Sequence, residues 1–145
     1  MIKKKVKPTE RFKQEMQAQG FQDINALCKD IAYHLTYENL EVKYLGRIGQ
    51  LFDPSWASDV QLGHVHLWDT GNPTFKAADQ KKWKNATDAY SRTSNTCIVY
   101  SAHWERESEI LLMGVATPCH GSASKLYDRN FMDYFKIEGE KFQDT

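Results

Sequence analysis

The chain has 145 residues, of which 41% are hydrophobic and 26% are charged, and 19 basic residues balance 19 acidic ones. This length and composition predict one folded domain spanning residues 1–145, and they exclude disorder, collagen and a simple coiled coil. The longest apolar stretch, residues 110–116, is too short to cross a membrane, and no apolar run typical of a secretory signal follows the N-terminal lysines. We therefore expect a cytoplasmic protein without a membrane partner.

Basic residues gather in two segments, residues 1–13 and 76–92, although the net charge is zero. Such segments could follow a phosphate backbone, or they could simply solvate the surface, and the charges alone favour the second interpretation. The three cysteines, Cys28, Cys97 and Cys119, are an odd number without a CxxC pair. This pattern is typical of a reducing compartment and predicts no disulfide framework.

The first forty residues predict two helices. Residues 2–7 form either a basic edge strand or a frayed tail. Thr9 is a suitable N-cap for a first helix that ends at Gly20, and Asp23 is one for a second helix. Apolar residues of the second helix recur at helical spacing, so we expect a helical hairpin that packs on another layer.

The remaining segments predict strands followed by a helix. We expect irregular structure over residues 44–62 and a long loop, with or without a helical turn, over residues 74–90. A charged connection at residues 103–107 joins two of the predicted strands. The strands are predicted at residues 64–68, 96–101 and 108–116, and the final helix at about residues 122–142.

The third strand contains the unbroken apolar run 110–113. A run without alternation is buried on both faces, so this strand should lie in the middle of the sheet. Helices, then strands joined by loops, then a helix predict an α+β fold with a small, mostly antiparallel sheet rather than a parallel sheet with crossover helices.

His64 and His66 form the most informative pair of polar residues. Side chains alternate along a strand, so Val65 and Leu67 should face the core while both histidines share the opposite, solvated face. Two imidazoles on one face suit acid/base catalysis or metal binding, but they could also be ordinary surface residues.

Two further segments contain candidate functional groups. Arg92 and Thr93 precede a strand, where an arginine beside small polar residues can bind phosphate, although the same string is typical of a turn. His120 follows the buried strand, where a rigid scaffold often presents functional groups. A zinc site built from His64, His66, Cys119 and His120 is an alternative, but no specific spacing motif supports it.

Several pieces of sequence occur in an order that is similar to one known family. They are Leu45-Gly46-Arg47 before Phe52-Asp53, the GHVHL string at 63–67, Ser91 to Asn95 running into Ile98-Val99-Tyr100, Leu111-Leu112, Pro118 with His120, and a last helix with Met132 and Glu140-Lys141-Phe142. Together they resemble the YafO family of toxins from type II toxin–antitoxin systems, over about two thirds of the chain. The first forty residues match only in pattern.

This resemblance implies a RelE-like endoribonuclease that cleaves mRNA on the translating ribosome without a cofactor. Its fold would be a small twisted antiparallel sheet with an N-terminal helical hairpin and a C-terminal helix. An antitoxin would inhibit it, and the toxin–antitoxin complex would bind its own operator DNA. The neutral charge of the chain is compatible with an enzyme that relies on the ribosome to present the RNA.

Metal-independent RNA cleavage needs a base, an acid and cations that stabilise the phosphorane. For these roles we expect His64, His66, Arg92 and His120 as catalytic residues, with no metal. Arg47, Thr93 and Lys125 are expected to bind substrate. Two alternatives stay open, a ribosome- or protein-binding module without catalysis and a zinc-dependent hydrolase.

Overall fold

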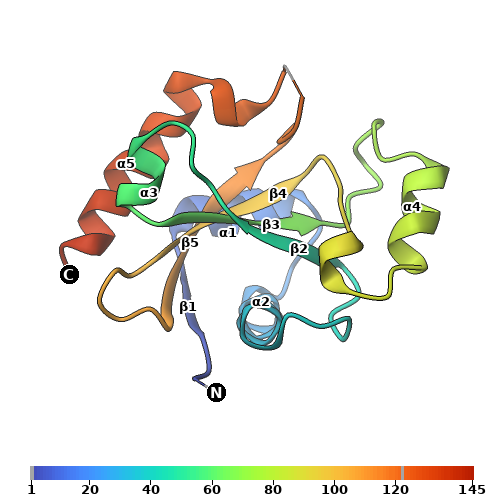
Figure 1. The fold of residues 1–145 in the computed structure, drawn as a ribbon, viewed down its shortest axis with the longest axis horizontal. Coiled ribbons are helices and arrows are strands. Elements are labelled where there is room, and N and C mark those ends of the chain that lie inside the picture. Colours follow the sequence, from blue (N-terminus) through green and yellow to red (C-terminus); the bar gives the residue numbers. More distant parts are fainter. Residues whose placement is uncertain (1, 122) are drawn as a thin grey trace.

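The computed structural model describes residues 2–121 and 123–145 (Figure 1). It is an α+β fold with one open, mostly antiparallel sheet, as the sequence predicts. The elements are β1 (Lys5–Pro8), α1 (Glu10–Ala18), α2 (Ile24–Tyr37), β2 (Leu45–Gln50), α3 (Trp56–Asp59), β3 (Leu62–Leu67), α4 (Ala77–Lys84), η1 (Ala89–Ser91), β4 (Cys97–Ala102), β5 (Glu109–Ala116), η2 (Lys125–Tyr127) and α5 (Arg129–Gln143).

The sheet has the strand order β1-β5-β4-β3-β2. Strands β2 to β5 pair antiparallel, whereas β1 adds to the edge parallel to β5. Residues 5–8 therefore form an edge strand, so the frayed-tail alternative is wrong for them. Because β5 lies between β1 and β4, its apolar run is covered on both faces, and Ile110 to Met113 are all buried as predicted.

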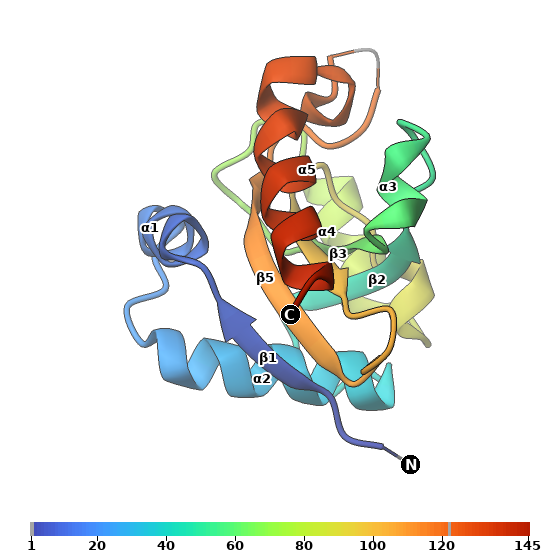
Figure 2. The same cartoon turned by 90° about the vertical axis from the view of Figure 1, so that its left-hand side faces the viewer.

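Helices cover both faces of this sheet, α1 and α2 on one side and α5 on the other (Figure 2). We call the first side the hairpin face. Both predicted caps are present, since the side chains of Thr9 and Asp23 accept hydrogen bonds from Phe12 N (3.1 Å) and Ala26 N (3.0 Å). The hairpin buries Phe12 and its neighbours against apolar residues of β3, β4 and β5.

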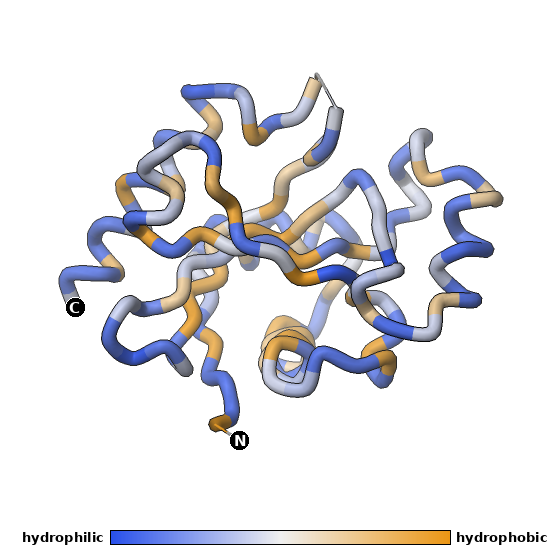
Figure 3. The backbone as a smooth tube through the Cα atoms, in the orientation of Figure 1, coloured by the Kyte–Doolittle hydropathy of each residue, from blue (hydrophilic) through white to orange (hydrophobic). Residues whose placement is uncertain are grey.

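The other side, which we call the α5 face, has a second apolar core. Met132 and Phe135 of α5 pack there with residues of β3, β4 and β5. Figure 3 shows the apolar residues concentrated along the central strands and the polar residues around the periphery. The expectation that this face is open to solvent is therefore wrong over much of its area.

Two segments expected to be irregular are ordered. Within residues 44–62 the structure forms β2 and the short helix α3, and within residues 74–90 it forms α4. Gly46 and Gly49 lower the strand propensity of β2, while Trp83 is the only buried residue of α4, so neither element has a strong periodic pattern. Trp83 anchors α4 by packing on Trp68 and Phe75 and by donating a hydrogen bond from Nε1 to Lys43 O (2.9 Å).

The last helix begins later than predicted, at Arg129, because Asp128 provides the N-cap and accepts a hydrogen bond from Phe131 N (3.2 Å). The predicted start at residue 122 lies outside the described residues. None of the helices in the described part of the chain is long and apolar enough to span a membrane.

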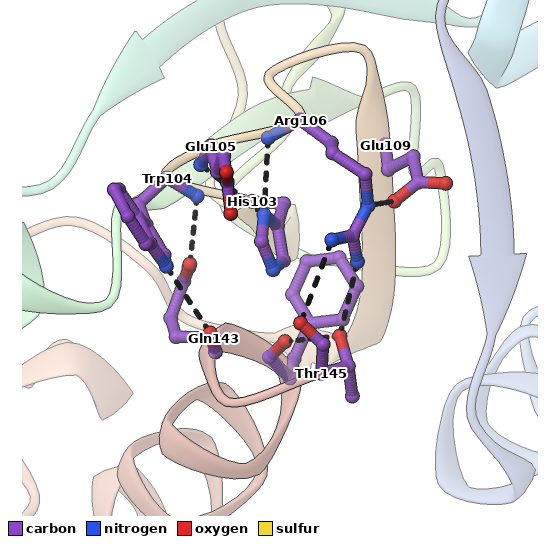
Figure 4. Close-up of polar contacts among 8 residues, drawn as sticks. His103, Trp104, Glu105, Arg106, Glu109, Gln143 and Thr145 are labelled. Atoms are coloured by element: carbon purple, nitrogen blue, oxygen red, sulfur yellow. Dashed lines mark hydrogen bonds and ion pairs between the residues drawn. The ribbon is translucent and has the colours of Figure 1, made fainter.

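The charged β4–β5 connection fastens the end of α5 to the sheet (Figure 4). Trp104 N donates to Gln143 Oε1 (2.8 Å), and Arg106 donates to Thr145 Oγ1 (3.2 Å) while pairing with Glu109. His103 Nδ1 accepts hydrogen bonds from two backbone N–H groups of the same turn, those of residues 105 and 106. This connection is thus a structural joint at the end of the sheet.

Candidate active site

Strand β3 presents His64 and His66 on the α5 face. Alternation along the strand places Val65 and Leu67 in the core beneath the hairpin, as the sequence predicts. In the ladder with β4, His64 pairs with Val99 and His66 pairs with Cys97. Paired residues of neighbouring strands share a face, so Cys97 lies beside His66.

A third imidazole joins this pair from the segment that follows β5. The Nε2 atoms of His66 and His120 are 3.2 Å apart, and their rings stack with centroids 4.8 Å apart. The ring centroid of His64 lies 5.4 Å from that of His66 and 6.3 Å from that of His120. We call these three residues the histidine cluster. The structure therefore brings together three of the four side chains expected to be catalytic.

The cluster spans the boundary between core and solvent. His66 is only 1% exposed, His64 is half-buried and His120 is exposed. The expectation that both strand histidines face solvent is therefore wrong for His66, which the second core encloses. His120 and His64 are accessible to solvent, whereas His66 lies buried behind them.

The turn before β4 holds the cluster in place through Ser94 and Asn95. Ser94 N donates to His66 Nδ1 (2.9 Å), and Ser94 O lies 3.0 Å from the same nitrogen. The Asn95 side-chain oxygen accepts hydrogen bonds from the backbone N–H groups of His120 (2.7 Å) and Cys119 (3.1 Å). From the sequence, both residues belong to a string that could be a phosphate clamp but is also typical of a turn, and only the tertiary structure shows that they fix the histidines.

Burial and mutual repulsion keep the cluster uncharged. Burial, followed by the neighbouring His120 and His64, lowers the pKa of His66 to about 3. Burial is also the largest cause of the lowered pKa of His64, and the neighbouring His120 and Arg47 add to it. Burial and then Arg47 lower the pKa of His120. Neutral imidazoles can accept protons, as a general base must.

Arg47 reaches this site because of a β-bulge in β2. Leu45 pairs with Leu67 and Ile48 with Val65, so β2 has one more residue than β3 over this interval. The extra residue keeps Ile48 against the hairpin core and turns Arg47 to the side of the histidine cluster. The Arg47 guanidinium lies over the Tyr90 ring (3.8 Å to the centroid), and its Nε donates to Tyr90 O (2.7 Å).

Arg92 does not join the histidine cluster, contrary to the sequence-based expectation. Its side chain is buried and donates hydrogen bonds to Val42 O (3.0 Å), Leu45 O (3.1 Å) and Leu40 O (3.2 Å). The guanidinium is thus committed to backbone carbonyls of the segment that leads into β2. Its geometry is that of a structural cross-link rather than of a phosphate ligand.

The other two expected substrate-binding residues lie at the surface. Thr93 is exposed between Arg92 and Ser94, and Lys125 is exposed in η2, where its backbone N–H donates to Pro118 O (2.8 Å). In the part of the chain that the structure describes, neither side chain forms a hydrogen bond with the histidine cluster. Both flank segments that contribute to the site.

Two cysteines lie directly against the histidines. Cys97 and Cys119 form a disulfide, with Cα atoms 6.1 Å apart, so the expectation of no disulfide is wrong. The spacing of 22 residues in the sequence gave no signal, because the contact depends on how β4 pairs with β5. Cys28, which is half-buried on α2, is a free cysteine.

The same side chains form two sets with the composition of a metal site. The potential ligand atoms of His64, His66 and Cys97 lie within 4.8 Å of one another, as do those of Cys97, Cys119 and His120. The zinc alternative considered from the sequence contained four of these five residues and lacked Cys97.

One family model matches most of the chain. The family model described as "Toxin YafO, type II toxin-antitoxin system" matches residues 28–144, which include every residue of the histidine cluster. No curated protein and no solved structure matches the chain. Since the match extends from α2 to the end of α5 and covers most of the 145 residues, the chain belongs to the YafO family of toxins, whose members act in type II systems with an antitoxin partner.

Proposed function

We propose that this toxin is an endoribonuclease that cleaves mRNA on the translating ribosome by metal-independent attack of the 2′-hydroxyl. The observation that carries the proposal is the convergence of three imidazoles on one face of the sheet. Of these, His120 is exposed and His64 is half-buried. Arg47 supplies a cation beside them. This combination meets the needs of RNA cleavage, namely proton transfer at two oxygens and stabilisation of a charged phosphorane.

In the proposed reaction a neutral histidine removes the 2′-hydroxyl proton, and the 2′-oxygen forms a bond to phosphorus. The bond between phosphorus and the 5′-oxygen breaks, and a protonated histidine gives its proton to that oxygen. The products are a 2′,3′-cyclic phosphate and a 5′-hydroxyl end. A bound phosphate carries negative charge and raises the pKa of an adjacent imidazole, so the acid becomes protonated when RNA binds.

His64 and His120 are the proposed acid/base pair, because a scissile phosphate can approach both. His66 is a positioning residue. Its burial keeps it neutral, and its Nε2 atom shares a hydrogen bond with His120 Nε2 (3.2 Å). Contacts with Ser94 fix the His66 ring, and the ring then fixes His120. This division of roles follows from burial, which the sequence did not reveal.

Arg47 is the proposed phosphate ligand in place of Arg92. Its Nε is bonded to Tyr90 O, which leaves the terminal guanidinium nitrogens available for an anion. Arg47 is also the cation that affects the pKa of all three clustered histidines. Thr93 and Lys125 are proposed as outer contacts to the RNA backbone.

The partners follow from the family and from the charge of the chain. A protein with zero net charge has little general affinity for RNA, so we propose that the ribosome presents the mRNA. We also propose that the antitoxin inhibits the enzyme by covering the histidine cluster, and that the toxin–antitoxin complex binds its own operator DNA.

The test is primer extension on mRNA from cells that express the wild type or the variants His64→Ala, His120→Ala or His66→Gln. Loss of a general acid or base should lower cleavage about 10²–10⁴-fold. The control is His103→Asn, which replaces a histidine of the β4–β5 connection with a side chain that can still accept hydrogen bonds. It should cleave like the wild type.

Thermal melts of the purified proteins separate chemistry from folding. Full cleavage by both His64→Ala and His120→Ala would refute the proposed mechanism. Translation arrest without any cleavage by the wild type would instead indicate a ribosome-binding module without catalysis.

A further inference from the structure

We propose that the chain with Cys97 and Cys119 reduced binds one thiophilic divalent cation of the zinc class at the histidine cluster. The ligands are the two cysteine sulfurs and the Nε2 atoms of His66 and His120. Two thiolates and two imidazoles are a common donor set for tetrahedral zinc. The site is additional to the proposed nuclease chemistry, which does not use a metal.

Five of the six donor pairs among these side chains have ligand atoms close together; only the pair His66–Cys119 falls outside both sets, so a bound ion requires separation of the two sulfurs and small side-chain rotations. The potential ligand atoms of Cys97, Cys119 and His120 lie within 4.8 Å of one another. The Nε2 atoms of His66 and His120 are 3.2 Å apart. Nitrogens that bind one tetrahedral zinc at about 2.0–2.1 Å are about 3.3–3.4 Å from each other. The observed spacing of the two histidines is therefore close to that of a ligand pair.

The surroundings of His66 are those of a metal-binding histidine. Its Nδ1 lies 2.9 Å from Ser94 N, which donates to it in the metal-free protein, and 3.0 Å from Ser94 O, to which the tautomer with a proton on Nδ1 would donate when Nε2 binds a metal. That tautomer leaves the Nε2 lone pair free on the side of Cys97 and His120. A backbone carbonyl that holds the far nitrogen of a ligand histidine is a regular feature of zinc sites.

The enclosure of the donors favours a bound ion over surface adsorption. Cys97, Cys119 and His66 are each at most 2% exposed, and His120 is the exposed fourth member through which an ion can enter. Three donors are thus fixed by packing before the metal arrives. Such preorganisation lowers the entropy cost of binding.

Metal binding and the disulfide exclude each other, because both use the same two sulfurs. A thiol reductant supplies two electrons and two protons to the Cys97–Cys119 bond and is itself oxidised to a disulfide. The ion then displaces the thiol protons as the two thiolates bind it. Binding also occupies the Nε2 atoms of His66 and His120, so the loaded protein cannot use His120 for proton transfer.

The test uses Co²⁺ as a spectroscopic probe on the full chain, reduced with a phosphine and stripped of metal with a chelator. We expect visible bands of tetrahedral Co²⁺ and a near-ultraviolet thiolate-to-cobalt band, both saturating at one ion per chain and lost when Zn²⁺ displaces Co²⁺. Oxidation of the same protein with diamide should abolish the bands, and renewed reduction should restore them. This comparison needs no substitution.

The variants Cys97→Ser and Cys119→Ser should each halve the thiolate band roughly and weaken Co²⁺ binding at least about tenfold. The matched control Cys28→Ser should leave both unchanged, since Cys28 lies on α2. Absence of the thiolate band in the reduced wild type would overturn the proposal, as would equally tight binding by the oxidised chain. The readout is optical, so neither result depends on whether the protein cleaves RNA.

Discussion

Replacement of Arg92 by alanine should destabilise the fold, whereas replacement of Arg47 should impair function. The two arginines are linked by the hydrogen bond from Arg47 N to Arg92 O (2.8 Å), yet their side chains have opposite surroundings. Arg92 is 5% exposed and bonded to three carbonyls, while Arg47 is half-buried and faces the histidine cluster.

The magnitude follows from the three hydrogen bonds. Each bond from a charged donor contributes about 1.5–3 kcal/mol, and the carbonyls at residues 40, 42 and 45 regain only part of this from water. Because such bonds are not additive, we expect Arg92→Ala to lower the free energy of unfolding by about 3–5 kcal/mol. For a chain of this size that corresponds to a fall in Tm of roughly 10–15 °C.

The assay is urea denaturation followed by circular dichroism, with cleavage measured in parallel at a temperature at which both variants are folded. Arg47→Ala should lose only about 0.5–1.5 kcal/mol of stability, because its side chain makes a single backbone bond and that bond is exposed to water, but it should lose about 10²-fold in cleavage. A wild-type urea midpoint for Arg92→Ala, combined with lost cleavage, would refute the reasoning and restore Arg92 as a phosphate ligand.

Three further predictions concern the histidine cluster. The pKa of His66 is lowered from its ordinary value of 6.5 to about 3, so the unfolded chain takes up a proton between these values and the folded chain does not. The stability that neutral His66 provides is therefore complete above pH 6.5 and is lost as the pH falls. Between pH 7 and pH 4.5 the wild type should lose about 2–3 kcal/mol more than His66→Gln in urea titrations, and equal losses would contradict this. Asn95→Ala removes the acceptor for two backbone N–H groups and should lower the free energy of unfolding by about 1–2 kcal/mol, with a loss of cleavage larger than this destabilisation alone would cause. Asn95→Asp should retain the stability of the wild type. Equal urea midpoints for Asn95→Ala and the wild type would count against the cross-link. Micromolar Zn²⁺ should inhibit cleavage by the reduced protein in a way that a chelator reverses, and undiminished cleavage by the fully loaded protein would exclude His120 from proton transfer.

The fold was largely predictable because its main elements have strong local signals. As N-cap residues, Thr9 and Asp23 indicate where the two N-terminal helices begin, and the unbroken apolar run of β5 indicates a central strand. Hydrophobic periodicity does not predict an element that buries only one or two of its residues. In helix α4 only Trp83 is buried, and the other residues are two alanines and polar side chains, so no helical period is visible.

The candidate site was predictable only in part, because strand alternation identifies a face but not what covers it. His64 and His66 share a face as alternation requires, yet His66 is buried against Ser94 and His120, which are far away in the sequence. The roles of the arginines were not readable either. Arg92 stands in a string that resembles a phosphate clamp, and its orientation toward the carbonyls of residues 40–45 is a tertiary property.

The position of Arg47 illustrates why register matters more than residue type at this site. In a regular strand Arg47 would share a face with Leu45, which lies in the core beneath the hairpin. The bulge inserts one residue between the pairs Leu45–Leu67 and Ile48–Val65, so the arginine turns to the histidine side while both apolar residues remain in contact with that core. The bulge thus keeps the apolar residues packed in the core and also turns Arg47 to the position required by its proposed function. Because Arg92 donates to Leu45 O and Trp83 donates to Lys43 O, two neighbouring buried side chains fix the beginning of the strand that carries the proposed phosphate ligand.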